Sequence, residues 1–154
     1  RLGLVGDNAE RLGHDIALVA ADGRFPPFRA GSFDRVLVDA PCSGLGVLRR
    51  RADARWRTGP ADVEELADLQ LDLLTAAAGL VRPGGLLFYS VCTLTSAETA
   101  GVDRRFREAT GVRPGPALGQ PWRPHGDDGA GGLLLPQDLD SEGMAIFRYR
   151  IDSA

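Results

Sequence analysis

Residues 35–44 read Arg-Val-Leu-Val-Asp-Ala-Pro-Cys-Ser-Gly, and this stretch decides the fold. Its residues 36–38 form an unbroken apolar run, which is typical of a parallel strand covered on both faces. Asp39 follows at the point where this strand is expected to end. Pro41 has no N–H to donate to a sheet ladder, so it stops the strand and places Cys42 on a loop beside a carboxylate.

A second apolar run repeats this arrangement. Residues 86–91 follow the turn sequence Arg-Pro-Gly-Gly at 82–85 and are expected to form a strand that ends at Cys92. The chain contains two cysteines, and each of them therefore follows a predicted strand. In open α/β sheets, ligands bind outside the carboxyl ends of the strands. Both thiols are thus expected at the edge of the sheet where a site would form.

Length and composition bound the class of protein. With 154 residues, of which 44% are hydrophobic and 25% charged, the chain is long enough for one globular domain over 1–154. Its apolar runs are shorter than the roughly 20 residues of a membrane helix, and no signal-peptide pattern opens the chain, which predicts a soluble cytoplasmic protein. Two cysteines make neither a disulfide framework nor a zinc-ligand spacing, so a metal is not expected.

The remaining periodicity predicts alternating helices and strands, the pattern of an α/β domain. Helices are expected over about 2–12, 60–80 and 95–109, and strands over about 16–21, 34–39, 86–91, 133–135 and 143–151, the last two as an antiparallel pair. Thr95 and Glu98 have the spacing of a capping box at the start of the third helix. Residues 114–132, rich in proline and glycine, predict a long surface loop. Gly-Leu-Gly at 44–46 opens no helix, which indicates close backbone packing rather than a dinucleotide fingerprint.

Residues 49–57 form a basic patch in a chain whose formal net charge is −3. Five of the 18 basic residues, all of them arginine, lie in this segment together with Trp56. Guanidinium groups match phosphate oxygens, and guanidinium and indole planes stack on bases, so single-stranded or flipped nucleotides are natural partners. The other interpretation is a solvated loop whose arginines pair with the acidic residues of the helix at 60–80.

The two cysteines also allow two interpretations, because a thiol is reactive when it is deprotonated and accessible and inert when it is buried. Both cysteines, Asp39 and Asp22 follow predicted strands, so one crevice is expected to collect them, which favours a site. Asp22 precedes Gly23, however, and on residue statistics alone this pair is more typical of a simple turn. A cysteine hydrolase is disfavoured because His14 and His125 are expected in the opening helix and in a loop.

Several motifs together resemble those of the Sun/Fmu-type RNA (cytosine-5) methyltransferases. They are Asp-Ala-Pro-Cys-Ser-Gly at 39–44, Gly-Val-Leu-Arg-Arg at 46–50, Trp56, Leu-Gln at 69–70, Pro-Gly-Gly at 83–85 and Tyr-Ser-Val-Cys-Thr at 89–93. The resemblance covers nearly the whole chain and implies a Rossmann-like fold that uses S-adenosylmethionine to methylate C5 of cytosine in RNA. Ribosomal RNA is expected as the substrate in preference to transfer RNA. The chain departs from the family at Val91, where threonine is usual, and at 143–145, where Gly-Phe-Phe is common. The alternative function is a non-catalytic RNA-binding module of the same fold.

The resemblance also implies roles for individual residues. Cys92 matches the nucleophile of the family, Cys42 the cysteine that assists product release, and Asp39 the acid that hydrogen-bonds the cytosine ring. The residues implied at the cofactor are Asp22, Asp39 and Pro41, and those expected at RNA are Arg49, Arg50, Arg51, Arg55 and Trp56. The first two strands and the cofactor loop of the family have no match here and are expected upstream of Arg1. The chain is therefore expected to be the carboxy-terminal part of a catalytic domain, truncated at its N-terminal side and inactive alone.

Overall fold

The computed structural model describes residues 2–152, which form a mixed sheet with helices. The elements in chain order are α1 (Leu2–Arg11), β1 (Phe33–Asp39), α2 (Ala54–Arg57), α3 (Pro60–Ala78), β2 (Val81–Val91), the π-helical turn η1 (Ala97–Gly101), α4 (Val102–Thr110), β3 (Arg113–Pro114), β4 (Arg123–His125), β5 (Gly131–Leu134) and β6 (Met144–Arg150). The six-stranded sheet has the order β1-β2-β6-β5-β4, and β3 also pairs with β6. β1 and β2 are parallel, whereas β6 runs antiparallel to both β2 and β5. The predicted α/β class and the predicted antiparallel pair are confirmed.

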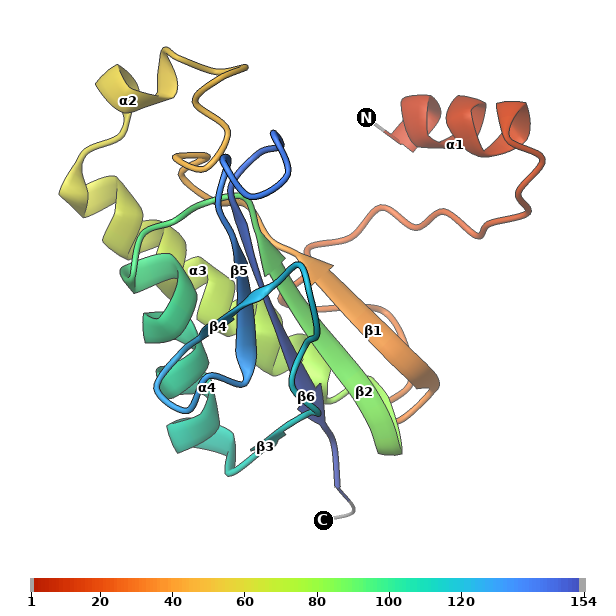
Figure 1. Ribbon diagram of the computed structural model, residues 1–154. Helices are drawn as coiled ribbons and strands as arrows, with labels where there is room; N and C mark the ends of the chain where they lie inside the picture. Colours follow the sequence, from red (N-terminus) through yellow and green to blue (C-terminus); the bar gives the residue numbers. More distant parts are fainter. Residues whose placement is uncertain (1, 153–154) are drawn as a thin grey trace.

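The core lies between the sheet and the helices α3 and α4, which pack side by side against it (Figure 1). Buried residues alternate along β2 and β6, because successive side chains of a strand point to opposite faces. The fully or nearly fully buried apolar side chains of β2, β6, α3 and α4 are Val81, Leu87, Tyr89, Val91, Ala145, Phe147, Tyr149, Ala67, Leu74, Ala77, Val102 and Phe106. This packing fixes β2 firmly, and with it the chain that leaves its carboxyl end.

β1 lies at the edge of the described sheet, which differs from the prediction that residues 36–38 are covered on both faces. β2 lies on one side of β1, and none of the strands within residues 2–152 pairs with its other side. Helix α3 packs against β1, but Leu37 remains 63% exposed. The apolar run therefore forms the expected strand without the expected cover.

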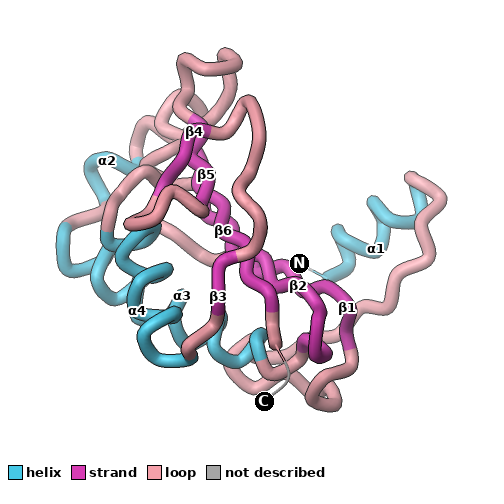
Figure 2. Tube along the Cα trace, turned by 60° about the horizontal axis from the view of Figure 1, so that its bottom comes forward, coloured by secondary structure: helices cyan, strands magenta, loops and turns pink. Residues whose placement is uncertain are grey.

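The strand predicted over 16–21 is wrong. Residues 14–22 have no regular structure, and Ile16, Leu18 and Val19 are exposed. A strand requires that its backbone N–H and C=O groups pair with a neighbour, and this segment forms no ladder with β1. Figure 2 shows α1 standing apart from the sheet, joined to it by this extended segment.

Two further boundaries differ from the predictions. β2 begins at Val81 instead of residue 86, so the Arg-Pro-Gly-Gly sequence lies within the strand, where the register with β1 shifts between Phe33 and Arg35. The loop predicted over 114–132 contains the short strand β4, which pairs with β5. The three residues of β4 and the five that β2 gains are too few to show a periodic hydrophobic pattern.

Candidate active site

The loops that carry the two cysteines leave the sheet side by side. Asp39 is the last residue of β1, and it lies opposite Ser90 of β2. The backbone N–H of Ala40 donates to the carbonyl of Ser90 at 3.0 Å, which ties the two strand ends together. Because β1 and β2 are parallel, both chains leave the same edge of the sheet (Figure 1). Cys42 and Cys92 follow directly on these two exits.

The two thiols are in contact. The Sγ atom of Cys42 lies 3.1 Å from the Sγ atom of Cys92, and both are free, partly buried thiols. Burial, and then the hydrogen bond to Cys92, raises the pKa of the Cys42 thiol to about 12. Cys42 is therefore protonated at neutral pH and is placed to donate its proton to the sulfur of Cys92. The geometry thus places a protonated thiol in contact with the sulfur of Cys92.

Gly46 brings three segments of backbone together beside Cys92. Its N–H donates to the carbonyl of Cys92 at 3.0 Å, and its own carbonyl accepts from the N–H of Gly143 at 2.8 Å. A Cβ at residue 46 would overlap the carbonyl of Gly143 and would lie 2.9 Å from the carbonyl oxygen of Cys92. The close backbone packing predicted for the glycines at 44–46 is thus confirmed at Gly46, where it leaves no room for a side chain.

A fully buried carboxylate lies next to the two cysteine loops. The side chain of Glu98, on η1, accepts five hydrogen bonds. They come from the N–H of Ser43 (2.8 Å), the hydroxyl of Ser43 (2.5 Å), Nε2 of Gln70 (3.0 Å) and the hydroxyls of Thr93 (3.1 Å) and Thr95 (2.8 Å). The capping box predicted for Thr95 and Glu98 is wrong, because no side chain caps the first turn of η1. A buried carboxylate is stable only when its oxygens are satisfied, and here the loops satisfy them.

Helix α3, predicted only as cover for the sheet, also supplies a polar group. Gln70 is fully buried, and its Nε2 atom donates to the carbonyl of Pro41 at 2.8 Å. Its Oε1 atom lies 2.8 Å from the hydroxyl of Tyr89 on β2. Gln70 interrupts the apolar stripe between Ala67 and Leu74 and belongs to the Leu-Gln motif at 69–70, but neither signal indicates that it binds the cysteine loop.

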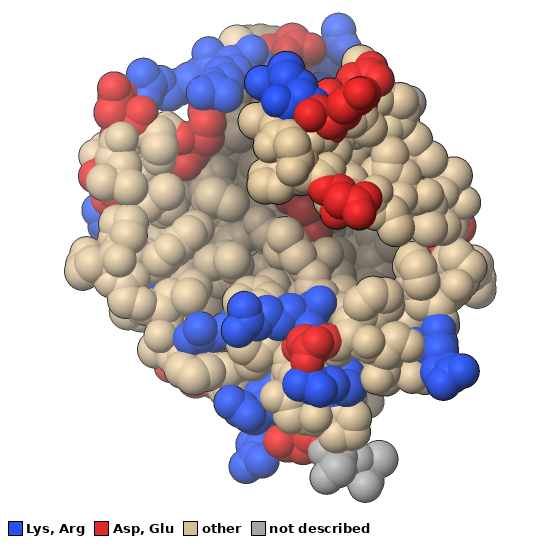
Figure 3. Space-filling model, turned by 90° about the vertical axis from the view of Figure 1, so that its right-hand side faces the viewer, with Lys and Arg blue, Asp and Glu red and all other residues tan. Residues whose placement is uncertain are grey.

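The predicted cofactor carboxylates lie beside two hollows on the β1 side of the molecule, the face that Figure 3 shows. Asp39 lines a hollow of about 270 Å³ between β1 and α3, and Asp22 lines one of about 370 Å³ beside the segment that follows α1. Gly23 and Pro26 line both hollows, which therefore adjoin. Asp39 is exposed and makes no side-chain hydrogen bond within residues 2–152, whereas Arg24 holds Asp22 at 2.7 Å.

Arg24 has a strong effect on the charge of Asp22. Hydrogen bonds from the side chain and the backbone of Arg24 lower the pKa of the Asp22 carboxyl to about 2. No strand precedes Asp22, and its carboxylate accepts from the backbone N–H of Arg24 at 2.9 Å, so it is a residue at the start of a turn. Pro41, the third residue implied at the cofactor, lines neither hollow, and its carbonyl is bound by Gln70. Asp39 and Pro41 therefore lie at the strand ends with the cysteines, and Asp22 does not.

The arginine patch at 49–57 follows the cysteine loop and includes the short helix α2. Arg49 pairs with Asp140 at 2.6 Å and Arg50 with Glu142 at 3.1 Å, so these two hold the loop before β6. Among residues 2–152, Arg51 and Arg55 have no ion-pair partner. The guanidinium of Arg55 lies 5.8 Å from the ring centre of its neighbour Trp56, which is 84% exposed.

These contacts bear on the two interpretations of the patch. None of its ion pairs within the described chain reaches the acidic residues of α3, so the interpretation as a loop paired with that helix is wrong. The pairs formed by Arg49 and Arg50 are with the loop before β6, and Arg57 pairs with Asp53 at 3.3 Å. Two cations and one indole are left facing solvent near the cysteine loop.

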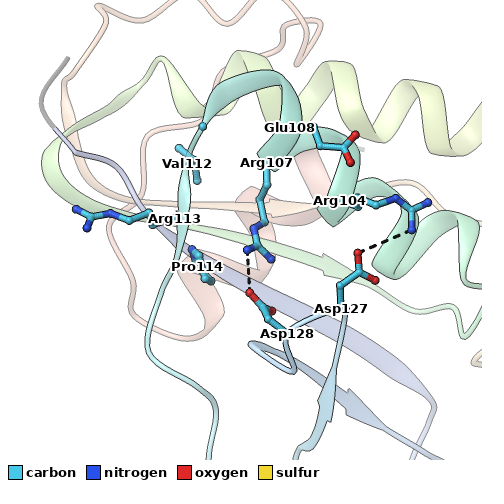
Figure 4. A pocket seen from close by; sticks show the side chains of 9 residues that line it. Arg104, Arg107, Glu108, Val112, Arg113, Pro114, Asp127 and Asp128 are labelled. Carbon is cyan, nitrogen blue, oxygen red and sulfur yellow. Dashed lines mark ion pairs between the residues drawn. The ribbon is translucent and has the colours of Figure 1, made fainter.

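Another hollow, of about 510 Å³, lies at the carboxyl end of α4 (Figure 4). It is rich in arginine, but these cations are paired: Arg107 binds Asp128 at 2.8 Å and Asp103 at 3.4 Å, and Arg104 lies 3.9 Å from Asp127. None of the predicted site residues lines it. The hollow therefore belongs to the packing of α4 against the loop that follows β4.

The histidine of a cysteine hydrolase is absent from the thiol pair. Nε2 of His125 lies 3.0 Å from the hydroxyl of Thr99, and burial lowers the pKa of this imidazole. His14 follows α1 and is exposed. In the part of the chain that the structure describes, no three ligating side chains cluster to hold a metal ion. Over the same residues, no helix has the length and apolar character needed to cross a membrane.

The chain is similar to known methyltransferases over most of its length. Residues 1–115 match the model of the family described as 16S rRNA methyltransferase RsmB/F. A Mycobacterium tuberculosis protein provisionally named as methyltransferase Rv1407 is 54% identical over 101 residues, which are 66% of this chain and 21% of that protein. The ribosomal RNA small subunit methyltransferase B of Salmonella newport is 38% identical over 146 residues, 94% of this chain and 33% of that enzyme. The chain thus spans a fifth to a third of these relatives.

A solved structure has the same fold. The crystal structure of NSun6 from Pyrococcus horikoshii with SFG superposes with a TM-score of 0.87 at 28% identity, covering 100% of this chain and 39% of that one. This likeness confirms the Rossmann-like α/β methyltransferase fold predicted from the motifs.

Proposed function

Because the chain belongs to the 16S rRNA methyltransferase RsmB/F family, we propose that it forms the part of an enzyme that methylates C5 of a cytosine in RNA. The observation that carries the proposal is the pair of thiols 3.1 Å apart at the carboxyl ends of β1 and β2. Ribosomal RNA is the substrate suggested by the names of the relatives. The methyl donor is S-adenosylmethionine, of which the SFG in the neighbouring structure is an analogue.

The reaction needs a thiolate because C5 of cytosine is a poor nucleophile. The Sγ thiolate of Cys92 adds to C6, the electron pair of the C5–C6 double bond forms a C4–C5 double bond, and the C4–N3 pair moves to N3, which gains a proton. C5 would then form a bond to the methyl group that a bound S-adenosylmethionine would supply, as the sulfur–methyl bond of the donor breaks and its neutral thioether leaves. A base removes the proton at C5, N3 gives up its proton, the C5–C6 double bond forms again, and the bond between Sγ and C6 breaks, which returns Cys92 as a thiolate. No oxidant or reductant is required.

Cys42 and Asp39 complete this chemistry. The pKa of Cys42 is raised to about 12, so Cys42 keeps its proton and can donate a hydrogen bond across the 3.1 Å contact to the Cys92 thiolate as it leaves C6. This assignment makes Cys92 the nucleophile and Cys42 the residue that assists release. Asp39, exposed at the end of β1, is the carboxyl group that hydrogen-bonds the cytosine ring during attack.

The described residues fit one side of an adenosyl group. The hollow beside Asp39 has apolar walls from Val36, Val38 and Leu73, which suit a flat ring, and a carboxylate at its rim, which suits a hydroxyl or amine donor. Asp22 brings a second carboxylate at the adjoining hollow. When bound, S-adenosylmethionine supplies an electrophilic methyl group.

Substitution of each cysteine tests the proposal. In the full chain with substrate RNA, Cys92→Ala should abolish methyl transfer and leave no covalent complex. Cys42→Ala should instead trap RNA on the protein, because attack by Cys92 remains and release fails. A denaturing gel separates trapped from free RNA, and the double variant, which should trap none, is the control. A Cys92→Ala protein that still methylates would overturn the assignment.

The same experiment also tests the second candidate, a non-catalytic RNA-binding module. Such a module would retain RNA affinity in every cysteine variant and would form no adduct with Cys42→Ala. The contact between the two sulfurs favours the enzyme, since a binding module has no need for two free thiols in contact at the strand ends.

A further inference from the structure

The carboxylate of Glu98 bridges the two loops that carry the cysteines. Ser43, the residue after Cys42, donates to it with its N–H and with its hydroxyl. Thr93, the residue after Cys92, donates to it with its hydroxyl at 3.1 Å. The hydroxyls of Ser43 and Thr93 also lie 2.9 Å apart. One buried side chain is therefore bonded to the immediate neighbour of each thiol.

The same carboxylate is anchored from a third direction. Nε2 of Gln70 spans from Oε1 of Glu98 (3.0 Å) to the carbonyl of Pro41 (2.8 Å), so α3 is joined to both Glu98 and the start of the cysteine loop. The hydroxyl of Tyr89 lies 2.6 Å from the backbone carbonyl of Glu98, which fixes η1 against β2. Glu98, Gln70 and Tyr89 are each fully buried. In such an environment a satisfied polar network is rigid, and a half-satisfied one is costly.

We infer that Glu98 is a positioning residue that holds the sulfurs of Cys42 and Cys92 at contact distance. The inference rests on the proposed function for its catalytic meaning, although the thiol geometry itself can be measured without RNA or cofactor. A displacement of about 1 Å between reacting groups can cost ~100-fold in rate, so such a support has direct consequences for turnover.

The donors differ between the two carboxylate oxygens, and this difference makes the inference testable. Oε1 accepts from the N–H of Ser43 and from Nε2 of Gln70, which can only donate. Oε2 accepts from the hydroxyls of Ser43, Thr93 and Thr95, which can rotate and accept instead. Glu98→Gln should therefore largely preserve the network, with its carbonyl in place of Oε1 and its NH₂ group facing the hydroxyls. Glu98→Leu, similar in size, removes the acceptor that all five of these hydrogen bonds share.

The distance between the thiols can be read as an effective concentration. The full chain is equilibrated with reduced and oxidised glutathione, and the fraction of Cys42–Cys92 disulfide is measured by mass spectrometry. Oxidised glutathione takes the two electrons, and two reduced glutathione molecules are released for each disulfide formed. We expect the equilibrium constant for forming the disulfide to stay close to the wild-type value in Glu98→Gln. In Glu98→Leu we expect this constant to fall by about tenfold or more. A folded Glu98→Leu protein with the wild-type equilibrium would overturn the inference.

A matched pair of variants keeps the test decisive if Glu98→Leu does not fold. Thr93 and Thr99 are both fully buried, but the hydroxyl of Thr99 donates to the carbonyl of Thr95 at 2.7 Å and does not reach Glu98. Thr93→Val should lower the disulfide equilibrium, whereas Thr99→Val should leave it unchanged. Equal effects of the two substitutions would show that Glu98 supports only the fold.

Kinetics then separate positioning from stability and from the proposed function. In an active wild-type enzyme, Glu98→Gln should retain most of kcat, and Thr93→Val should lower kcat with little change in the KM for RNA. Thr93→Val could lower the disulfide equilibrium while the wild type shows no methyl transfer. That result would support the positioning role and reject the proposed function. Methyl transfer with unaltered kcat in Thr93→Val would reject the positioning role alone.

Discussion

The raised pKa of Cys42 has consequences that do not depend on RNA. Desolvation is its main cause, with the contact to Cys92 second, and it moves the thiol from its ordinary value of 9.0 to about 12. The folded protein therefore binds this proton more tightly than the unfolded chain does. By linkage, Cys42 contributes stability below pH 9.0, and this contribution is lost as the pH rises toward about 12.

We expect the free energy of unfolding to fall between pH 9.0 and about 12 more steeply for the wild type than for Cys42→Ser. Serine does not titrate in this range, so the difference in slope isolates the thiol. Urea unfolding at several pH values measures it. Identical slopes for the two proteins would mean that the folded environment does not perturb Cys42, and the proton-donor role would lose its support.

Glu98 and Gln70 show, residue by residue, why the site was only partly predictable. The cysteines could be placed because each follows an apolar run with a clear stop, and Pro41 marks one of these stops. The spacing of Thr95 and Glu98 is the same for a capping box and for a side-chain bridge, and only burial by α3 and the cysteine loops selects the second. A long-range contact such as that of Ser43 with Glu98 has no local signature.

Among the elements, α2 and the arginines around it form the surface that we propose binds RNA beside the thiols. Arg51 and Arg55 are exposed, whereas Arg49 and Arg50 are already engaged by Asp140 and Glu142. Exposed guanidinium groups beside an exposed indole suit phosphate contacts and base stacking. The four arginines should therefore not contribute equally.

Arg51→Glu with Arg55→Glu should weaken RNA binding by about 1–3 kcal/mol per contact and reduce the slope of log K against log salt by about one for each lost phosphate contact. The matched control is Arg104→Glu with Arg113→Glu, which has the same change in charge but lies at the hollow by α4 (Figure 4). Binding titrations over a series of salt concentrations measure both. Equal losses in the two double variants would show a general charge effect and no RNA contact by the patch.

The segments at 16–21 and 60–78 illustrate which elements a sequence can predict. Helix α3 has a wide apolar stripe that is repeated over many turns, and its predicted span agrees closely with Pro60–Ala78. Residues 16–21 have the composition of a strand but not its partner, and pairing is a property of the whole sheet. The prediction that both faces of β1 are covered was wrong for the same reason, because an apolar run alone does not indicate which elements pack against it.

For the whole molecule, the order of strands and the common exit of β1 and β2 gather the thiols and Asp39 at one edge of the sheet. The residues proposed to bind the cofactor are not gathered into one pocket in this way. Asp39 and Asp22 lie at separate, adjoining hollows of about 270 and 370 Å³, and Arg24 already holds Asp22. Pockets for small molecules commonly bury roughly 70–90% of the surface of their ligand. Two separate, open hollows cover less of a ligand than such a pocket does.

We therefore expect residues 1–154 alone to bind S-adenosylmethionine no more tightly than about 1 mM, where the free energy of binding is only about −4 kcal/mol. The described chain offers an apolar wall and two carboxylates, but Gly23, which lines both hollows, leads to turns and β1 and not to the N-terminus of a helix. Calorimetric titration measures the affinity, with Asp39→Asn as the control for any binding that occurs. Micromolar binding that is lost in Asp39→Asn would show that the hollows beside β1 already form a complete cofactor site.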